Sequence, residues 1–205
     1  ADADMPTGSI LVELRLGFRY VLDTPVIFML LGCNFLMVFF SLTYFMLLPG
    51  FAKDVLAAGP DRLGLLISIS GIGSLLGSLY IASFGKRRRA RILLWGAGIM
   101  GISLLLFAIS THFWISVALL TVVGFGQATR MSLSNVLIQS YVEDEFRGRV
   151  MSIYMLEMAL LSVSIYPISL LAEFYGPQWA VGLSAIGLII MVVILFNVPR
   201  YRDLD

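Results

Sequence analysis

Two ionisable residues, Arg130 and Glu157, lie inside long apolar stretches of the sequence. Charged side chains are costly in hydrocarbon, and those found there usually face a partner or a transport pathway. Arg130 lies nine residues before Gln139, near the end of one stretch, and Glu157 lies seven residues after Val150, the start of the next. At about 1.5 Å per residue, both are expected roughly 10–14 Å inside the same end of a helical bundle. This equal depth predicts an Arg130–Glu157 ion pair.

The predicted pair has two interpretations. In the first it is a structural clamp that neutralises two buried charges. In the second it is a proton or substrate switch, in which protonation of Glu157 frees Arg130.

Several polar and aromatic residues at similar depth are candidates for lining a substrate cavity. Asn34, Ser41 and Phe45 fall near one helix face, because they are spaced by seven and four residues. A cavity that mixes aromatic rings with a few amides suits a bulky, partly apolar substrate. The alternative is that such side chains join neighbouring membrane helices. The candidates are Asn34, Ser41, Tyr44, Phe45, Gln127, Ser134 and Asn135.

The sequence offers little other chemistry. One histidine, His112, and one cysteine, Cys33, cannot make a zinc site, and a lone cysteine cannot form an intrachain disulfide. A Ser–His–Asp enzyme would need His112, which is isolated in a short turn. The net charge of +1 gives no basic field for a nucleic acid. We therefore expect no enzymatic activity, no metal and no cofactor.

Composition indicates that lipid surrounds much of the chain. Hydrophobic residues make up 59% of the 205 residues and charged residues 13%, whereas soluble domains average roughly 45–50% and about 25%. In lipid the backbone must satisfy its own hydrogen bonds, and apolar runs of about 20 residues select helices over a barrel. The predicted fold is an all-α, polytopic membrane helical bundle with six transmembrane helices. The predicted spans are Val26–Leu48, Asp61–Phe84, Ile92–Ser110, Trp114–Gln139, Val150–Leu171 and Trp179–Val198.

A helix outside the spans is predicted near the start of the chain. Leu14, Phe18 and Leu22 recur there at helical spacing with Arg15 and Arg19 between them. This pattern is too charged to span and is typical of an amphipathic helix on the membrane surface. The predicted division is a linker over 1–8, this interfacial helix over 9–24, the six-helix domain over 25–199 and a cytoplasmic tail over 200–205.

Lysine and arginine are distributed unevenly around the predicted spans. Five of the 14 fall in the cluster at 86–91, and most of the others lie on the same side. Basic short loops mark the cytoplasmic side, so both termini are predicted to be cytoplasmic. The cluster is interpreted as this topology signal, with a specific anionic-lipid site as the alternative.

Two internal patterns concern how the helices are arranged. Trp95-x-x-Gly98 and Trp179-x-x-Gly182 are 84 residues apart. Two three-helix units would produce this spacing, and an odd helix number makes the second unit inverted in the membrane. In the second span, Gly73-x-x-x-Gly77 favours a close approach to a neighbouring helix.

Four stretches resemble a known family. They are Leu16–Leu31, Leu47–Leu56, Gly64–Leu79 and Val136–Tyr154, the last with an acidic run and Arg-Gly-Arg. Together they resemble the C-terminal half of a major facilitator superfamily transporter, in the branch of the bacterial enterobactin exporter and the macrolide efflux proteins. The resemblance places Gly85, Lys86 and Arg87 at the Gly-basic-basic positions of that family's cytoplasmic gating loop. Ala82 stands where the family has an acidic residue.

The resemblance implies a function. It implies a secondary active transporter of the bacterial inner membrane, which exports small organic molecules, drug-like or siderophore-like, by proton antiport and alternating access. The implied partners are the substrate, the proton, the bilayer and an N-terminal six-helix half. The alternative is a non-transporting membrane bundle, such as a channel subunit or an assembly factor. A channel would be expected to carry a pore ring or a filter segment, and the sequence shows neither.

Overall fold

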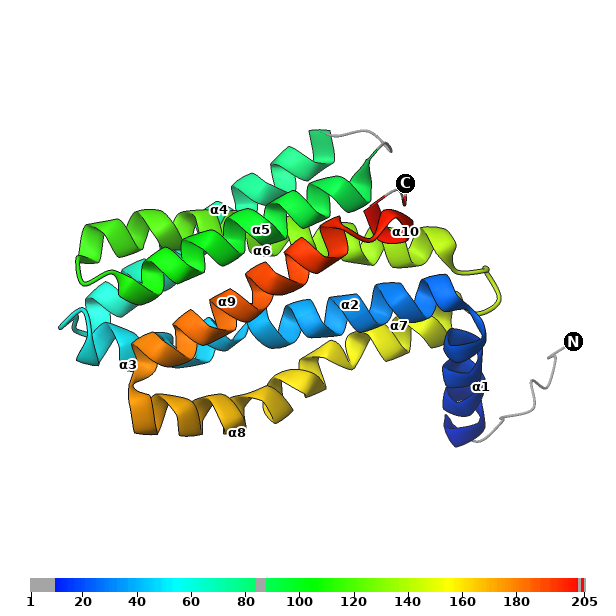
Figure 1. Cartoon of the computed structure of the whole chain (residues 1–205), viewed down its shortest axis with the longest axis horizontal. Coiled ribbons are helices and arrows are strands. Elements are labelled where there is room, and N and C mark those ends of the chain that lie inside the picture. The colour runs from blue at the N-terminus through cyan, green and yellow to red at the C-terminus, as the bar shows by residue number, and fades with distance from the viewer. Residues whose placement is uncertain (1–9, 84–87, 203, 205) are drawn as a thin grey trace, which may run out of the picture.

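The computed structural model describes residues 10–83, 88–202 and 204, and within these ranges every regular element is an α-helix. This confirms the all-α prediction. The long helices run along one axis as a bundle, and α1 stands across one end of it (Figure 1). The helices are α1 (Ile10–Asp23), α2 (Pro25–Ser41), α3 (Thr43–Asp54), α4 (Pro60–Ser83), α5 (Arg89–Ile109), α6 (Phe113–Tyr141), α7 (Arg147–Met155), α8 (Glu157–Tyr175), α9 (Pro177–Phe196) and α10 (Pro199–Arg202).

Five helical stretches in the described part of the chain are long and apolar enough to cross a membrane. They are α2 joined with α3, then α4, α5, α6 and α9. The fifth predicted span, Val150–Leu171, corresponds to α7 and α8, which a turn at Leu156 separates. In the described part of the chain, two of these segments are therefore interrupted, α2–α3 at Leu42 and α7–α8 at Leu156.

The first span extends further than the sequence predicts. We expect an end at Leu48, before Pro49, but α3 continues through Pro49 to Asp54. A proline inside a helix removes one backbone hydrogen bond. Burial offsets that loss, because Phe51 is fully buried and stacks on Phe107 of α5 with 4.3 Å between ring centroids.

Helices α4 and α6 pack closely against each other, because glycines on both helices leave no side chain between the two backbones. Gly73 and Gly77 are buried, and a Cβ on Gly73 would collide with the backbone of Thr121. In the opposite direction, a Cβ on Gly124 of α6 would collide with the backbone of Ser70. This confirms the predicted small-residue packing, in which missing side chains let two backbones approach.

Large apolar side chains cover the outside of the bundle. Leu75 and Leu79 of α4, for example, are 66% and 68% exposed. Exposed apolar surface on this scale is expected for helices that face lipid.

The two terminal segments pack onto the bundle. The interfacial helix predicted over 9–24 is α1, and its Val21 is buried. Tyr201, in the predicted tail, is also buried, and this burial raises the pKa of its phenol above the ordinary value. The phenol therefore stays neutral and packs with the core.

Candidate functional site

Three helices bring together a buried polar triad, defined here as Asn34, Arg130 and Glu157. Asn34 comes from α2, Arg130 from α6 and Glu157 from the first residue of α8. None of the three is more than 2% exposed. Arg130 Nη1 donates to Asn34 Oδ1 at 3.0 Å, and Asn34 Nδ2 donates to Glu157 Oε2 at 2.9 Å. The amide of Asn34 therefore links the two charges.

The triad differs from the predicted direct ion pair in having this amide between its charged groups. A primary amide has an acceptor oxygen and a donor nitrogen, so it can face a guanidinium on one side and a carboxylate on the other. Hydrogen bonds to ionised groups are stronger than neutral ones. Depth along the helices alone predicts that Arg130 and Glu157 are near each other, and the structure adds how they are joined.

The turn at Leu156 gives Glu157 a particular electrostatic environment. It makes Glu157 the first residue of α8, where the backbone N–H groups have no partner within the helix. The same turn separates the carboxylate from α7, so a small change of angle between the two helices would move it.

Sequence reasoning missed Tyr154, which completes the surroundings of the triad. Tyr154 is 1% exposed, and it interacts electrostatically with both Glu157 and Arg130. Among the described residues, neither its hydroxyl nor Arg130 Nε has a hydrogen-bond partner. Unpartnered buried polar atoms are costly and rare. Tyr154 and Arg130 thus each have a buried polar atom available for a further hydrogen bond.

The remaining cavity candidates lie in different environments. Ser41 is fully buried, with a hydroxyl that lacks a partner among the described residues, while Phe45 is 45% exposed. Asn135 accepts a hydrogen bond from Gln139 of the same helix. Of the others, Tyr44 and Ser134 are buried, and Gln127 is half-buried. The structure thus joins Asn34 to the charged pair and leaves the role of the other candidates as a prediction.

Two further predictions concern loops and metals. Gly85, Lys86 and Arg87, the residues of the predicted gating loop, lie outside the described residues. In the part of the chain that is described, no three His, Cys, Asp or Glu side chains gather where they could hold a metal ion.

Comparison with known families identifies a match over most of the chain. The family model described as Major Facilitator Superfamily matches residues 11–204, nearly the whole chain. No curated protein and no solved structure matches the chain. With its membrane-spanning helices and its buried charges, the chain belongs to the major facilitator superfamily of secondary transporters.

Proposed function

We propose that this chain acts as the C-terminal half of a proton-coupled exporter of small organic molecules. The half would work with an N-terminal six-helix half by alternating access in a bacterial inner membrane, with both termini cytoplasmic. The observation that carries the proposal is the buried triad, in which Asn34 connects a cation and an anion on three different helices.

The proposed chemistry starts with a proton that binds the carboxylate of Glu157. Neutral Glu157 no longer balances the charge of Arg130, which is fully buried. An uncompensated buried charge costs several kcal/mol, about 3–5 when one member of a pair is removed. This cost drives α6, α7 and α8 toward an arrangement in which Arg130 has another partner. Tyr154, near the turn at Leu156, is a candidate for that exchange, because its buried hydroxyl has no hydrogen-bond partner among the described residues.

The proposed substrate is bulky and partly apolar. The cavity candidates on α2, α3 and α6 supply amides, hydroxyls and aromatic rings, which suit such a molecule. Gly85, Lys86 and Arg87 are proposed to act in the gate between the helices at the cytoplasmic face. The gate role follows from the resemblance to the major facilitator superfamily, and the cavity role follows from residue type and depth.

The test uses the full-length transporter in proteoliposomes with an imposed pH gradient. Glu157→Gln is expected to abolish proton-driven transport and to keep substrate exchange without a gradient, because a neutral amide mimics the protonated carboxyl. Glu173→Gln is the matched control, since Glu173 is an exposed acid on the same helix. Full proton-driven transport by the Glu157→Gln protein would contradict the proposal. A clamp without a switch would show equal losses in both assays.

A further inference from the structure

The helix α1 presents an apolar stripe to its surroundings. Leu14, Phe18 and Leu22 are 36%, 47% and 65% exposed, and their spacing of four residues places them along one line of the helix. Arg15 and Arg19 are exposed beside the stripe. Arg19 makes a 3.7 Å contact with Asp23, which is weak at such an exposed site. The helix therefore offers apolar contact flanked by positive charge.

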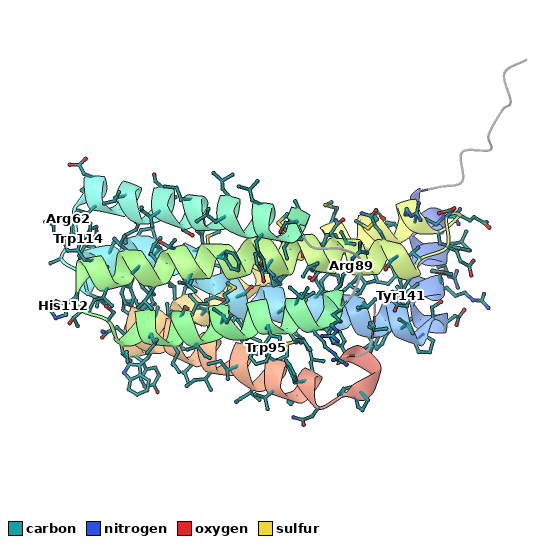
Figure 2. The ribbon with its side chains drawn as sticks, turned by 90° about the horizontal axis from the view of Figure 1, so that it is seen from above. Arg62, Arg89, Trp95, His112, Trp114 and Tyr141 are labelled. Carbon is teal, nitrogen blue, oxygen red and sulfur yellow. The ribbon has the colours of Figure 1, made fainter. Side chains whose placement is uncertain are left out.

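The orientation of α1 suits a bilayer surface. The long helices run along the bundle, and α1 stands across its end and reaches past α7 (Figure 1). If the long helices cross the membrane, α1 must lie parallel to its surface. Figure 2 places Arg89 and Tyr141 toward this end of the bundle, and His112 and Arg62 at the other. An apolar stripe with flanking arginines at this level fits acyl chains and lipid phosphates.

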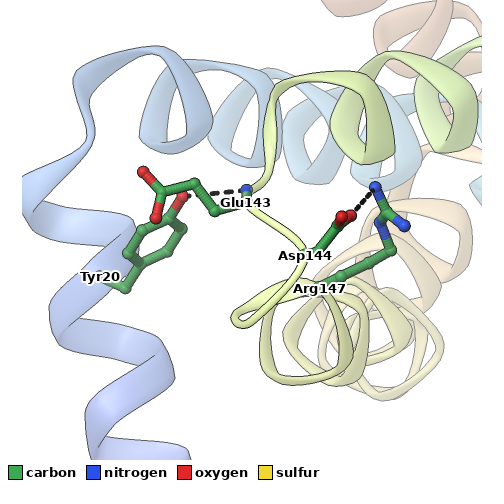
Figure 3. A network of polar contacts seen from close by, with 4 residues as sticks. All are labelled: Tyr20, Glu143, Asp144 and Arg147. Atoms are coloured by element: carbon green, nitrogen blue, oxygen red, sulfur yellow. Dashed lines mark hydrogen bonds and ion pairs between the residues drawn. The ribbon is translucent and has the colours of Figure 1, made fainter.

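Another side of α1 is fixed to the bundle. A Cβ on Gly17 would lie 3.1 Å from Cβ of Arg149 and 3.4 Å from Cδ1 of Ile153, so the backbone of α1 lies directly on α7. The ring of Tyr20 stacks on Phe146, with 4.1 Å between centroids. The Tyr20 hydroxyl accepts a hydrogen bond from the backbone N–H of Glu143 at 3.3 Å (Figure 3).

This attachment ends close to the buried triad. Ile153, which Gly17 faces, is the neighbour of Tyr154 in α7. Helix α7 then ends at Met155, and Glu157 follows after the turn at Leu156. Any force that holds α1 therefore acts on the helix that leads into Glu157.

We propose that α1 is a lipid-docked strut. It binds an anionic bilayer surface through its apolar stripe, Arg15 and Arg19, and through Gly17 and Tyr20 it fixes the position of α7. The effect on Glu157 rests on the proposed function, whereas the binding to lipid does not.

The lipid contact is tested with nitroxide labels in nanodiscs, in the Cys33→Ser protein. Labels at Leu22→Cys and Leu16→Cys form a matched pair, because both leucines are exposed but lie about 120° apart around α1, with Leu22 in the stripe and Leu16 outside it. In anionic nanodiscs the label at 22 is expected to be shielded from an aqueous nickel chelate, and the label at 16 is expected to stay accessible. Equal accessibility would overturn the proposal. So would spin–spin broadening between copies, which would assign the stripe to a second chain.

The link to α7 is tested by hydrogen exchange of the backbone amides. Anionic lipid, compared with neutral lipid, is expected to slow exchange in α7 by about five-fold for each arginine engaged, with α4 as the internal control. Arg15→Gln with Arg19→Gln should remove this effect. Unchanged α7 exchange would overturn the strut. The Glu157→Gln protein should keep the shielded label, so a failure of proton coupling is distinguishable from a failure of lipid docking.

Discussion

At the scale of single residues, Asn34 sets how the two buried charges interact. Its oxygen accepts from Arg130 and its nitrogen donates to Glu157. An amide does not titrate, so it can relay the charge state of one residue to the other without taking the proton itself. We propose that Asn34 is a positioning residue, and its loss should affect both charges.

Asn34→Leu is expected to lower the free energy of unfolding by about 3–5 kcal/mol, because both charges lose their bridging partner in a buried site. Denaturant or thermal unfolding in nanodiscs measures this change. Asn197→Leu is the matched control, since Asn197 is exposed just after α9 and its side-chain amide donates to the backbone oxygen of Val193 in that helix. It should change stability by about 0.5 kcal/mol or less. Equal effects of the two substitutions on stability would contradict the bridging role of Asn34.

A double-mutant cycle tests whether the charges depend on each other. Arg130→Met and Glu157→Gln should each destabilise by about 3–5 kcal/mol, because each leaves one charge uncompensated. The double variant should cost less than the sum of the single costs, by at least about 1 kcal/mol. Unfolding measured on the four proteins gives the coupling. Additive costs would show that the two side chains act independently.

Sequence alone predicts the charged pair but not its arrangement. Arg130 and Glu157 stand out because charge is rare in apolar stretches, and their depth follows from helical rise. Asn34 is identifiable only as a polar residue at similar depth, since pairing depends on how the helices rotate. Tyr154 is missed because an uncharged aromatic residue in an apolar stretch does not stand out as Arg130 and Glu157 do.

At the scale of helices, glycine sets the distance between α4 and α6. A side chain at Gly73 would collide with the Thr121 backbone, whereas nothing lies within 4 Å of a Cβ placed on Gly71. Gly73→Leu is therefore expected to destabilise the chain by about 1–3 kcal/mol or more. Gly71→Leu, two residues earlier in the same helix, should change the free energy of unfolding by no more than about 0.5 kcal/mol. Thermal unfolding of the two variants checks this, and equal stability would refute the close contact.

The sequence predicts the presence of each helix better than it predicts where the helix begins and ends. Pro49 predicts an end that burial of Phe51 overrides, and the apolar run from Val150 to Leu171 hides a turn. Both deviations have the same cause, because local sequence rules do not include contacts between helices. The Gly73-x-x-x-Gly77 pattern gives a correct prediction, because small residues at this spacing themselves indicate a close contact between two helices.

At the scale of the whole molecule, the two ends of the bundle differ. Trp114 and Trp179 are exposed near the end with the α5–α6 and α8–α9 connections (Figure 1), where aromatic side chains favour the lipid–water boundary. The opposite end carries α1 and the start of α5 with its arginines. Composition predicts that the helices span lipid, and loop charge predicts their orientation.

Cysteine labelling tests that orientation. In the Cys33→Ser protein, His112→Cys should react with an impermeant maleimide added outside intact cells, because His112 is exposed at the end predicted to face outward. Glu145→Cys, exposed in the α6–α7 connection, should react only after the membrane is opened. The reverse pattern would invert the predicted topology.

Substrate-induced proton release is the most direct test of the central claim, that the triad binds and releases the coupling proton. Purified full-length transporter is mixed with substrate in weakly buffered solution containing a pH dye. The wild-type protein is expected to release protons as substrate binds, and the Glu157→Gln protein is expected to release none while it still binds substrate. Equal release by the two proteins would contradict the account.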